Sequence, residues 1–256
     1  MGITLENVSY TYQEGTPLAS TALSDVSLAI KDGSYTALIG HTGSGKSTLL
    51  HLIPRYFDAT EGQITIDGTN IKDISLSKLR DMLGFVPQKG VLFSGTIASN
   101  IKFGDENISD EDMYKAAEIA QALEFIEGKE DKFDSEISQG GSNVSGGQKQ
   151  RLSIARALAK NPKILLFDDS FSALDYKTDV KLRKTLREKM QDTTTIIVAQ
   201  RIATILNADK IIVMNEGEVV GIGKHQELLK TCPTYLEIAE SQLSEEELAK
   251  GDKHNE

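Results

Sequence analysis

The chain has 256 residues, of which 39% are hydrophobic and 26% are charged. This length and composition are typical of a globular protein with a substantial core, and they exclude a peptide, a fibre or a disordered chain. A formal net charge of −10 disfavours nucleic acid and anionic lipid as binding partners. Cys232 is the one cysteine in the sequence, which excludes an internal disulfide and favours a reducing, cytoplasmic environment.

The two ends of the sequence add further expectations. Residues 1–10 lack the basic start and the apolar stretch of a secretory signal, and apolar runs elsewhere are short, so we expect no direct membrane insertion. Residues 237–256 carry seven acidic and two basic side chains. We therefore predict one domain over residues 1–240 and an acidic, disordered tail over residues 241–256.

Strand patterns dominate the first forty residues. Hydrophobic residues alternate over residues 3–12 and 23–30, and a short strand is predicted over residues 35–39. Glycines follow this strand, and residues 46–53 then have the apolar spacing of a helix that ends before Pro54. The predicted order around residue 40 is strand, glycine loop, helix.

The middle of the chain has helix patterns instead. Ser109 opens a segment with apolar residues at helical spacing, and we predict a helical subdomain over about residues 90–155. Beyond it, helices alternate with buried strands at residues 164–167, 194–199 and 210–214. This alternation predicts an α/β fold with a mostly parallel sheet.

Residues 40–47 have the phosphate-binding pattern G-x-x-x-x-G-K-[ST], between the predicted strand and the predicted helix. Its glycines let backbone N–H groups point toward phosphates, Lys46 neutralises phosphate charge, and the Ser47 hydroxyl can bind Mg²⁺. We interpret His41 as a loop residue that contributes its backbone. The predicted nucleotide-binding residues here are Gly40, His41, Thr42, Gly43, Ser44, Gly45, Lys46, Ser47 and Thr48.

A phosphate-binding loop needs a carboxylate on a neighbouring strand to hold its metal ion. Residues 163–167 are an apolar strand followed by Asp168, which we predict to bind Mg²⁺. An apolar strand that ends in Asp is common and by itself indicates only the end of a strand. Here the glycine-containing run Val144–Gln148 and a basic amphipathic helix precede the strand, and this order favours a metal-binding role for Asp168.

Six motifs occur in a fixed order, and through them the sequence resembles the ATP-binding domain of ABC transporters over almost its whole length. Besides the phosphate-binding loop and the strand before Asp168, they are Phe85–Gln88, the signature Val144–Gln148, the D-loop Ser172–Asp175 and the switch region Ile197–Arg201. The resemblance implies a P-loop (RecA-like) α/β core, an N-terminal antiparallel β subdomain and an inserted helical subdomain. It also implies ATP and Mg²⁺ as cofactors.

The same resemblance implies that two such domains close head to tail around two ATP molecules. A helix N-terminus is an anion site, so the signature residues would act on the partner's ATP. They are Ser145, Gly146, Gly147 and Gln148. By resemblance, Tyr12 would stack on adenine, Gln88 would contact Mg²⁺ and the attacking water, and Asp175 belongs to the D-loop. The implied membrane partner is a set of transmembrane transporter domains, which would hold the chain at the inner face of the cell membrane.

Two positions depart from the family pattern. Asp169 follows Asp168 where the family usually has Glu, and Gln200 stands where the family has a His that contacts the γ-phosphate. Displacing a general base by about 1 Å costs roughly 100-fold in rate. We therefore predict slow hydrolysis at the chain's own site, with Asp169, Gln200 and Gln88 as its catalytic set. The alternative is that Asp serves adequately as the base.

The signature departs from the family pattern only at Val144, which replaces Leu. An altered own site beside an intact signature resembles one half of a heterodimeric ABC exporter with a degenerate ATP site. The segment Pro87–Ile97 is also similar to exporters, whereas Gln139 and Gly140 replace the Glu and Arg that exporters have before the signature.

Residues 1–50 are more similar to the ATPases of energy-coupling-factor vitamin importers. This difference suggests a hybrid of two ABC lineages, and divergence within one family is the alternative. A working importer ATPase is the second functional candidate, opposed by Asp169 and Gln200. A chromosome-maintenance switch would need a coiled coil between Gln88 and Val144, and no such heptads occur there. A phosphotransferase would give the signature no role.

Overall fold

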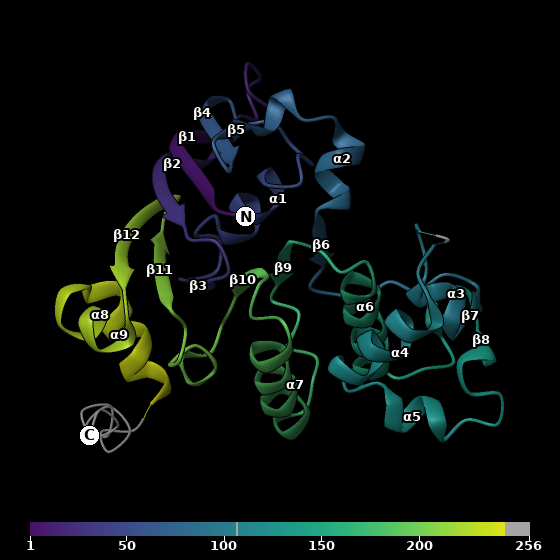
Figure 1. Cartoon of the computed structure of the whole chain (residues 1–256). Helices are drawn as coiled ribbons and strands as arrows, with labels where there is room; N and C mark the ends of the chain where they lie inside the picture. Colours follow the sequence, from purple (N-terminus) through teal and green to yellow (C-terminus); the bar gives the residue numbers. More distant parts are fainter. Residues whose placement is uncertain (106, 244–256) are drawn as a thin grey trace. The chain divides into compact units, whose positions relative to one another are not determined.

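The computed structural model describes residues 1–105 and 107–243, and the chain forms two compact units (Figure 1). Of the described residues, the first unit contains 1–79 and 194–243, and the second contains 80–105 and 107–193. Helix α2 (Leu76–Asp81) includes the boundary between them. Each unit combines strands with helices, which confirms the predicted α/β class.

The first unit begins with an antiparallel sheet in the order β2-β1-β4-β5. Ile3 pairs with Ile30 on one side and with Ile66 on the other, and all three side chains are buried. Alternating apolar residues therefore cover one face of this sheet, as predicted for the N-terminal β subdomain. The strands are β1 (Ile3–Tyr12), β2 (Ser20–Ile30), β4 (Glu61–Ile66) and β5 (Thr69–Asn70).

The first unit also contains parallel strands. Strand β3 (Tyr35–Ile39) pairs in parallel with β10 (Thr194–Val198) and with β11 (Lys210–Asn215), while β12 (Glu218–Gly223) pairs antiparallel to β11. Every residue of β3 and β10 is buried, so neither strand alternates in sequence. The carboxyl ends of parallel strands share one edge, and there β3 leads into Gly40 and helix α1 (Lys46–Leu52).

Short helices complete the first unit. They are η1 (Ile71–Asp73), η4 (Ile202–Thr204), α8 (His225–Thr231) and α9 (Pro233–Gln242). Residues 241 and 242, which the sequence analysis assigned to the tail, belong to α9. The rest of that predicted tail, from residue 244 on, lies outside the described residues.

The second unit is built on two parallel strands, β6 (Leu83–Val86) and β9 (Ile164–Asp168), in which Val86 lies opposite Phe167. Helix α6 (Gly146–Ala159) packs on β6. Gly84 permits this packing, because an added Cβ would lie 2.8 Å from the carbonyl oxygen of Ala157. The two strands end together, so the segments after Val86 and after Phe167 leave from the same edge.

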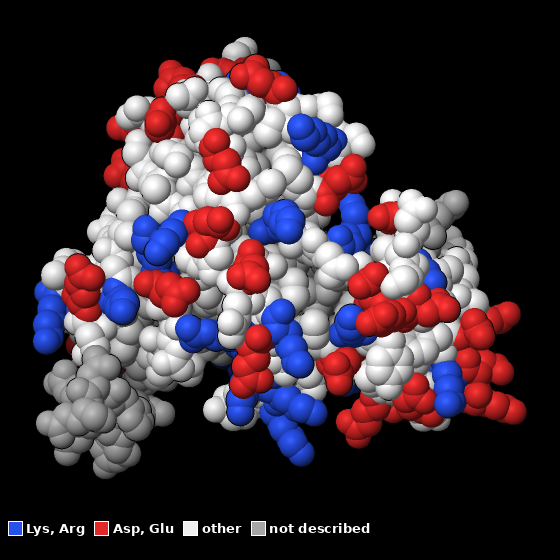
Figure 2. Space-filling model, in the orientation of Figure 1, with Lys and Arg blue, Asp and Glu red and all other residues white. Residues whose placement is uncertain are grey.

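Helices make up most of the predicted helical region. They are α3 (Ile97–Ile101), α4 (Asp110–Ile119), α5 (Leu123–Glu127), η2 (Lys132–Asp134), η3 (Gln139–Gly141) and α6, and α7 (Tyr176–Lys189) follows β9. The sequence analysis missed β7 (Gly95–Thr96) and β8 (Glu136–Ile137), which are too short to show a period. Acidic side chains gather over α4 and α5 (Figure 2). Within the described residues, no helix is both long and apolar enough to cross a membrane.

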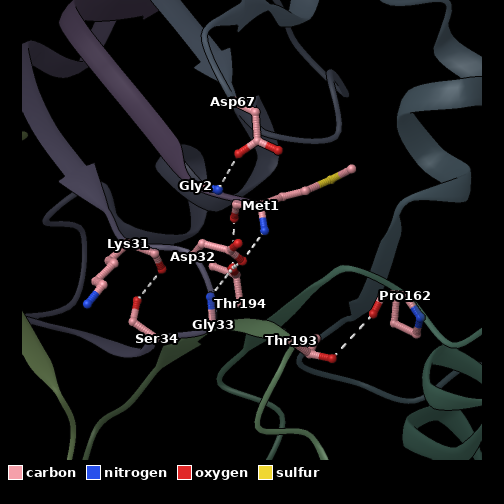
Figure 3. A network of polar contacts seen from close by, with 10 residues as sticks. All are labelled: Met1, Gly2, Lys31, Asp32, Gly33, Ser34, Asp67, Pro162, Thr193 and Thr194. Carbon is pink, nitrogen blue, oxygen red and sulfur yellow. Dashed lines mark hydrogen bonds and ion pairs between the residues drawn. The ribbon is translucent and has the colours of Figure 1, made fainter.

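Thr193 is the last residue of the second unit, and Thr194 is the first residue of the second segment of the first unit; each makes a hydrogen bond within its own unit. In the second unit, the Thr193 hydroxyl donates to the carbonyl of Pro162 at 3.4 Å. In the first unit, the Thr194 hydroxyl donates to the carbonyl of Met1 at 2.7 Å and accepts from the amide of Gly33 at 3.0 Å (Figure 3). The start of β10 is thereby tied to the segments that precede β1 and β3.

Candidate functional site

Two glycines of the phosphate-binding loop are required by close backbone contacts. An added Cβ on Gly40 would lie 2.1 Å from the carbonyl oxygen of Met214, and one on Gly45 would lie 2.6 Å from that of Ala22. Gly45 also has a φ of +94°, a region that L side chains rarely adopt. The loop is therefore fixed by its backbone, between β3 and α1.

Lys46 places its charge inside this loop. Its Nζ donates to the carbonyl oxygens of Gly40 at 2.9 Å and His41 at 2.7 Å, and to Ser44 Oγ at 2.9 Å. His41 contributes its backbone carbonyl to this contact, and its role toward a nucleotide stays a prediction. An ammonium group is a suitable partner for a phosphate, because charge-assisted hydrogen bonds to phosphate oxygens are strong.

The side chain of Tyr12 lies beside the helix that follows the loop. Its hydroxyl is 3.0 Å from Thr48 Oγ1, and its ring packs edge-on against Tyr10 and Phe57, with centroids 4.8 and 5.7 Å away. Tyr12 and Thr48 of the predicted nucleotide-binding set therefore lie together. Ser47, the residue before Thr48, is exposed.

Gln200 follows strand β10 in the same unit and is exposed. Its carbonyl accepts a hydrogen bond from Gln242 Nε2 at 2.8 Å, and Gln242 Oε1 accepts one from the amide of Ile202 at 2.8 Å. The switch segment is thus fixed by a glutamine of α9. The sequence analysis missed Gln242, because nothing in the local pattern of α9 indicates a long-range contact.

Two of the predicted catalytic residues meet in the second unit. Gln88 Nε2 donates to Asp169 Oδ2 at 3.0 Å. Asp169 is 8% exposed and has a φ of +47°, a left-handed conformation that Asp tolerates better than most residues. Asp168 is the last residue of β9 and is 7% exposed. Both carboxylates therefore stand at the carboxyl end of one buried strand.

The turn that carries Asp169 is held by two serines. Ser170 is fully buried, and its hydroxyl donates to the carbonyl of Val86, the last residue of β6, at 2.7 Å. Ser172 Oγ donates to the carbonyl of Asp169 at 2.9 Å. Sequence patterns do not single out Ser170, because its contact with Val86 joins two segments that are far apart in the sequence.

The predicted signature forms the start of α6. Ser145 is the N-cap: its Oγ accepts from the amide of Gln148 at 3.2 Å, and Gln148 Oε1 accepts from the amide of Ser145 at 3.0 Å. This reciprocal pair is a capping box. An added Cβ on Gly146 would meet no atom within 4 Å, and one on Gly147 would make only an ordinary contact with Ala173.

Asp175 caps helix α7. Its Oδ1 accepts from the amide of Thr178 at 3.0 Å, and this hydrogen bond holds the pKa of Asp175 below its usual value. The side chain is exposed. Its capping role accounts for the Asp at this position, and its D-loop role stays a prediction.

The structure thus brings together Tyr12, Thr48 and the phosphate-binding loop in the first unit, and Gln88 with Asp169 in the second. A glycine loop between a parallel strand and a helix is the site of an α/β nucleotide-binding protein. A sequence profile described as ABC transporter matches residues 23–172, more than half of the chain. The chain belongs to the ABC transporter family, as the resemblance predicted.

Individual relatives agree with this assignment. An uncharacterized ABC transporter ATP-binding protein of Mycobacterium bovis is 45% identical over 223 residues, which cover 86% of this chain and 38% of the relative. An ABC transporter ATP-binding protein of Bacillus subtilis is 41% identical over 243 residues, 95% of this chain and 42% of the relative. A Staphylococcus aureus protein named as a multidrug export ATP-binding/permease protein is 43% identical over 233 residues, 91% of this chain and 40% of the relative.

A solved structure is also similar. The bacterial Atm1-family ABC exporter with ATP bound has a TM-score of 0.90 and 38% sequence identity, and the similarity covers 95% of this chain and 42% of the exporter chain. The chain therefore spans about two fifths of the length of the relatives that it matches.

Proposed function

We propose that this chain is an ATP-binding subunit that dimerises head to tail around Mg-ATP and drives a transmembrane partner, while its own site hydrolyses ATP slowly. The observation that carries the proposal is the hydrogen bond from Gln88 Nε2 to Asp169 Oδ2 at 3.0 Å. This hydrogen bond engages one oxygen of the Asp169 carboxylate, and Asp169 is the group that would have to accept a proton from the attacking water.

Slow hydrolysis follows from the chemistry of Asp169 and Gln200. A general base must come within about 2.6–3.2 Å of the group that it deprotonates, and Asp is one methylene shorter than the Glu of the family pattern. Asp169 is also buried in a turn fixed by Ser170 and Ser172, so it has little freedom to move outward. Gln200 can hydrogen-bond but cannot carry the positive charge of a protonated His.

ATP would bind through the phosphate-binding loop. Lys46 would exchange loop carbonyls for phosphate oxygens, which are stronger partners for an ammonium group. The side chains of Ser47, Gln88 and Asp168 carry hydroxyl, amide and carboxylate oxygens, which are the types of ligand that Mg²⁺ prefers. The ion would neutralise phosphate charge when bound.

The signature supports a role toward a second chain. Gly146 and Gly147 lower helix propensity by about 1 kcal/mol each, yet neither is needed for packing inside the described structure. Glycines let a backbone approach a ligand closely. Together with the exposed Ser145 at the start of α6, they support binding of the partner's ATP at this helix N-terminus. An altered own site with an intact signature favours a heterodimer.

A transmembrane partner is supported by an exposed aromatic pair. The rings of Phe93 and Phe103 stack with centroids 4.2 Å apart, and the two residues are 43% and 50% exposed. Arg156 lies beneath both rings and bonds to the carbonyl oxygens of Asn100 and Val91, and burial lowers its pKa to about 10, so it stays charged at neutral pH. Such a pair suits a protein contact, which would hold the chain peripherally at the inner face of the membrane.

The hybrid origin of residues 1–50 is a separate hypothesis. The alignment with the Bacillus subtilis relative covers 243 of the 256 residues, so it includes most of these fifty positions. One relative therefore aligns on both sides of the region where the two resemblances meet. A hybrid junction predicts poorer packing between residues 1–40 and the later strands of the first unit, measurable as a lower stability than that of a single-lineage relative.

The nucleotide that remains bound after incubation tests the proposal. The chain is incubated with Mg-ATP, desalted, and its bound nucleotide is separated by chromatography. We expect mostly ATP on the unchanged chain, mostly ADP on Asp169→Glu/Gln200→His, and little nucleotide on the control Lys46→Ala. Mostly ADP on the unchanged chain would favour the active importer-type ATPase, and no nucleotide would refute ATP binding.

A further inference from the structure

Gln150 is a buried polar residue of α6 that the mechanism above does not use. Its side chain is 1% exposed, and both ends of its amide are paired. Nε2 donates to the carbonyl of Pro87 at 3.0 Å, and Oε1 accepts from the amide of Gly90 at 2.8 Å. One side chain thus holds the loop on both sides of Gln88.

Gly90 lets the same loop lie directly on the backbone of α6. An added Cβ on Gly90 would lie 2.8 Å from the carbonyl oxygen of Lys149 and 3.1 Å from the Cα of Gln150. The loop and the helix therefore have no space between them at this point. A shift of one would move the other.

The other end of the loop is fixed as well. The buried Ser170 hydroxyl holds the carbonyl of Val86, and Gln88 Nε2 reaches Asp169 at 3.0 Å. Gln88 itself is exposed, so packing holds its side chain less firmly than that of a buried residue. Its position depends on where the loop backbone is held, at Val86 on one side and at Pro87 and Gly90 on the other.

Helix α6 also carries the signature. Ser145 caps it, and Gln150 lies five residues further on, which is about 7.5 Å along the axis. The helix is continuous between the two positions. One rigid element therefore connects the residues that would face the partner's ATP with the loop that carries Gln88.

We propose that Gln150 is a positioning residue that acts through Gln88: its amide sets the distance between Gln88 and Asp169 and ties that pair to the signature helix. The inference rests on the proposed function, in which Gln88 and Asp169 belong to the ATP site. A purely structural Gln150 would stabilise the loop without affecting the reaction, and the two roles differ in measurable ways.

A double-mutant cycle of Gln88 and Gln150 separates them. Gln150→Met keeps the length of the side chain but removes both hydrogen bonds, and Gln88→Ala removes the amide that reaches Asp169. Hydrolysis of bound ATP is measured as a single turnover, with the full chain in excess, after ATP binding has been confirmed on the unchanged chain. Gln191→Met makes the same chemical change at an exposed position.

We expect each single substitution to lower the rate by about 10-fold or more, because small displacements at a reacting centre are costly. The double variant should be no slower than Gln88→Ala within about 2-fold, since Gln150 then has nothing to position. Gln191→Met should match the unchanged chain. An unaffected Gln150→Met rate, or a double variant as slow as the product of the two effects, would overturn the proposal.

Gln150→Glu covers the case in which Gln150→Met does not fold. The Glu can accept from Gly90, but only its protonated form can donate to the carbonyl of Pro87. Its rate relative to the unchanged chain should therefore rise as the pH falls from 8 to 6, and a constant ratio below 1 would contradict positioning. Fast turnover by the unchanged chain would refute only the proposal that its own site is slow. The proposal for Gln150 would still be tested, because the double-mutant cycle compares ratios of rates.

Discussion

The loop after β3 and the loop after β9 both place polar groups at the carboxyl end of a buried strand, but they are held in different ways. In the first loop, Gly40 and Gly45 lie against neighbouring backbone so closely that no Cβ would fit. In the second, side-chain contacts do this work, through Ser170 to Val86 and Gln88 to Asp169.

This difference explains which part of the site a sequence pattern can specify. Backbone contacts demand particular residues at particular positions, so the phosphate-binding loop has a fixed pattern that is recognised directly. Side-chain contacts permit exchange of one polar residue for another. The second loop can therefore keep its shape while its chemistry changes, as at Asp169.

Gly45→Ala should have the largest effect on stability. It combines a φ of +94° with a Cβ only 2.6 Å from the carbonyl oxygen of Ala22, and we expect a loss of about 3 kcal/mol or more in the free energy of unfolding. Gly68→Ala is the matched control, because Gly68 has a φ of +79° but open space around it, and it should cost about 1 kcal/mol. Equal losses in denaturant unfolding would show that close contact does not fix the first loop.

Gly146→Ala should impair function without impairing the fold. Its Cβ would meet nothing inside the described structure and Ala has the higher helix propensity, so the free energy of unfolding should not fall and should rise by at most about 1 kcal/mol. In the Asp169→Glu/Gln200→His background, where a second copy supplies the signature, ATP turnover should fall by about 10-fold or more. Unchanged turnover would indicate that this helix N-terminus does not meet a nucleotide.

Ser170→Ala tests the side-chain contacts of the second loop. The variant removes a buried hydrogen bond to the carbonyl of Val86, which should cost about 1–2 kcal/mol in the free energy of unfolding. Ser172→Ala is the control, because the exposed Ser172 hydroxyl can be replaced by water and its loss should cost less than about 0.5 kcal/mol. A Ser170→Ala loss no larger than that of the control would argue against a fixed turn at Asp169.

Much of the fold could be predicted from the sequence, because local sequence patterns specify local backbone structure. The alternating β1 and β2, the buried β3, β9 and β10, and the helix starts at Ser109 and Ser145 all have local signals. The contacts of Gln150, Ser170 and Gln242 join segments that are far apart in the sequence, and no local pattern encodes them. The sequence therefore predicts which residues belong to the candidate site, but it does not predict which other side chains hold those residues in place.

The smallest expected effect is a pH dependence of the first unit. His225 is 6% exposed, its Nδ1 lies 2.7 Å from the Tyr235 hydroxyl, and burial lowers its pKa. As the pH falls below about 6.5, the unfolded state binds a proton before the folded state does, so stability is lost with acidification. Tm should therefore fall less between pH 7.5 and 5.5 in His225→Gln than in the unchanged chain. An equal fall would exclude a contribution from His225.

The most direct test of the slow own site is ATP turnover at equal ATP occupancy, compared between the unchanged chain and Asp169→Glu/Gln200→His. The account predicts that both bind ATP and that the double variant is faster by a factor on the order of 100, because it regains the longer base and the chargeable switch residue. Turnover by the unchanged chain as fast as that of the double variant would contradict it.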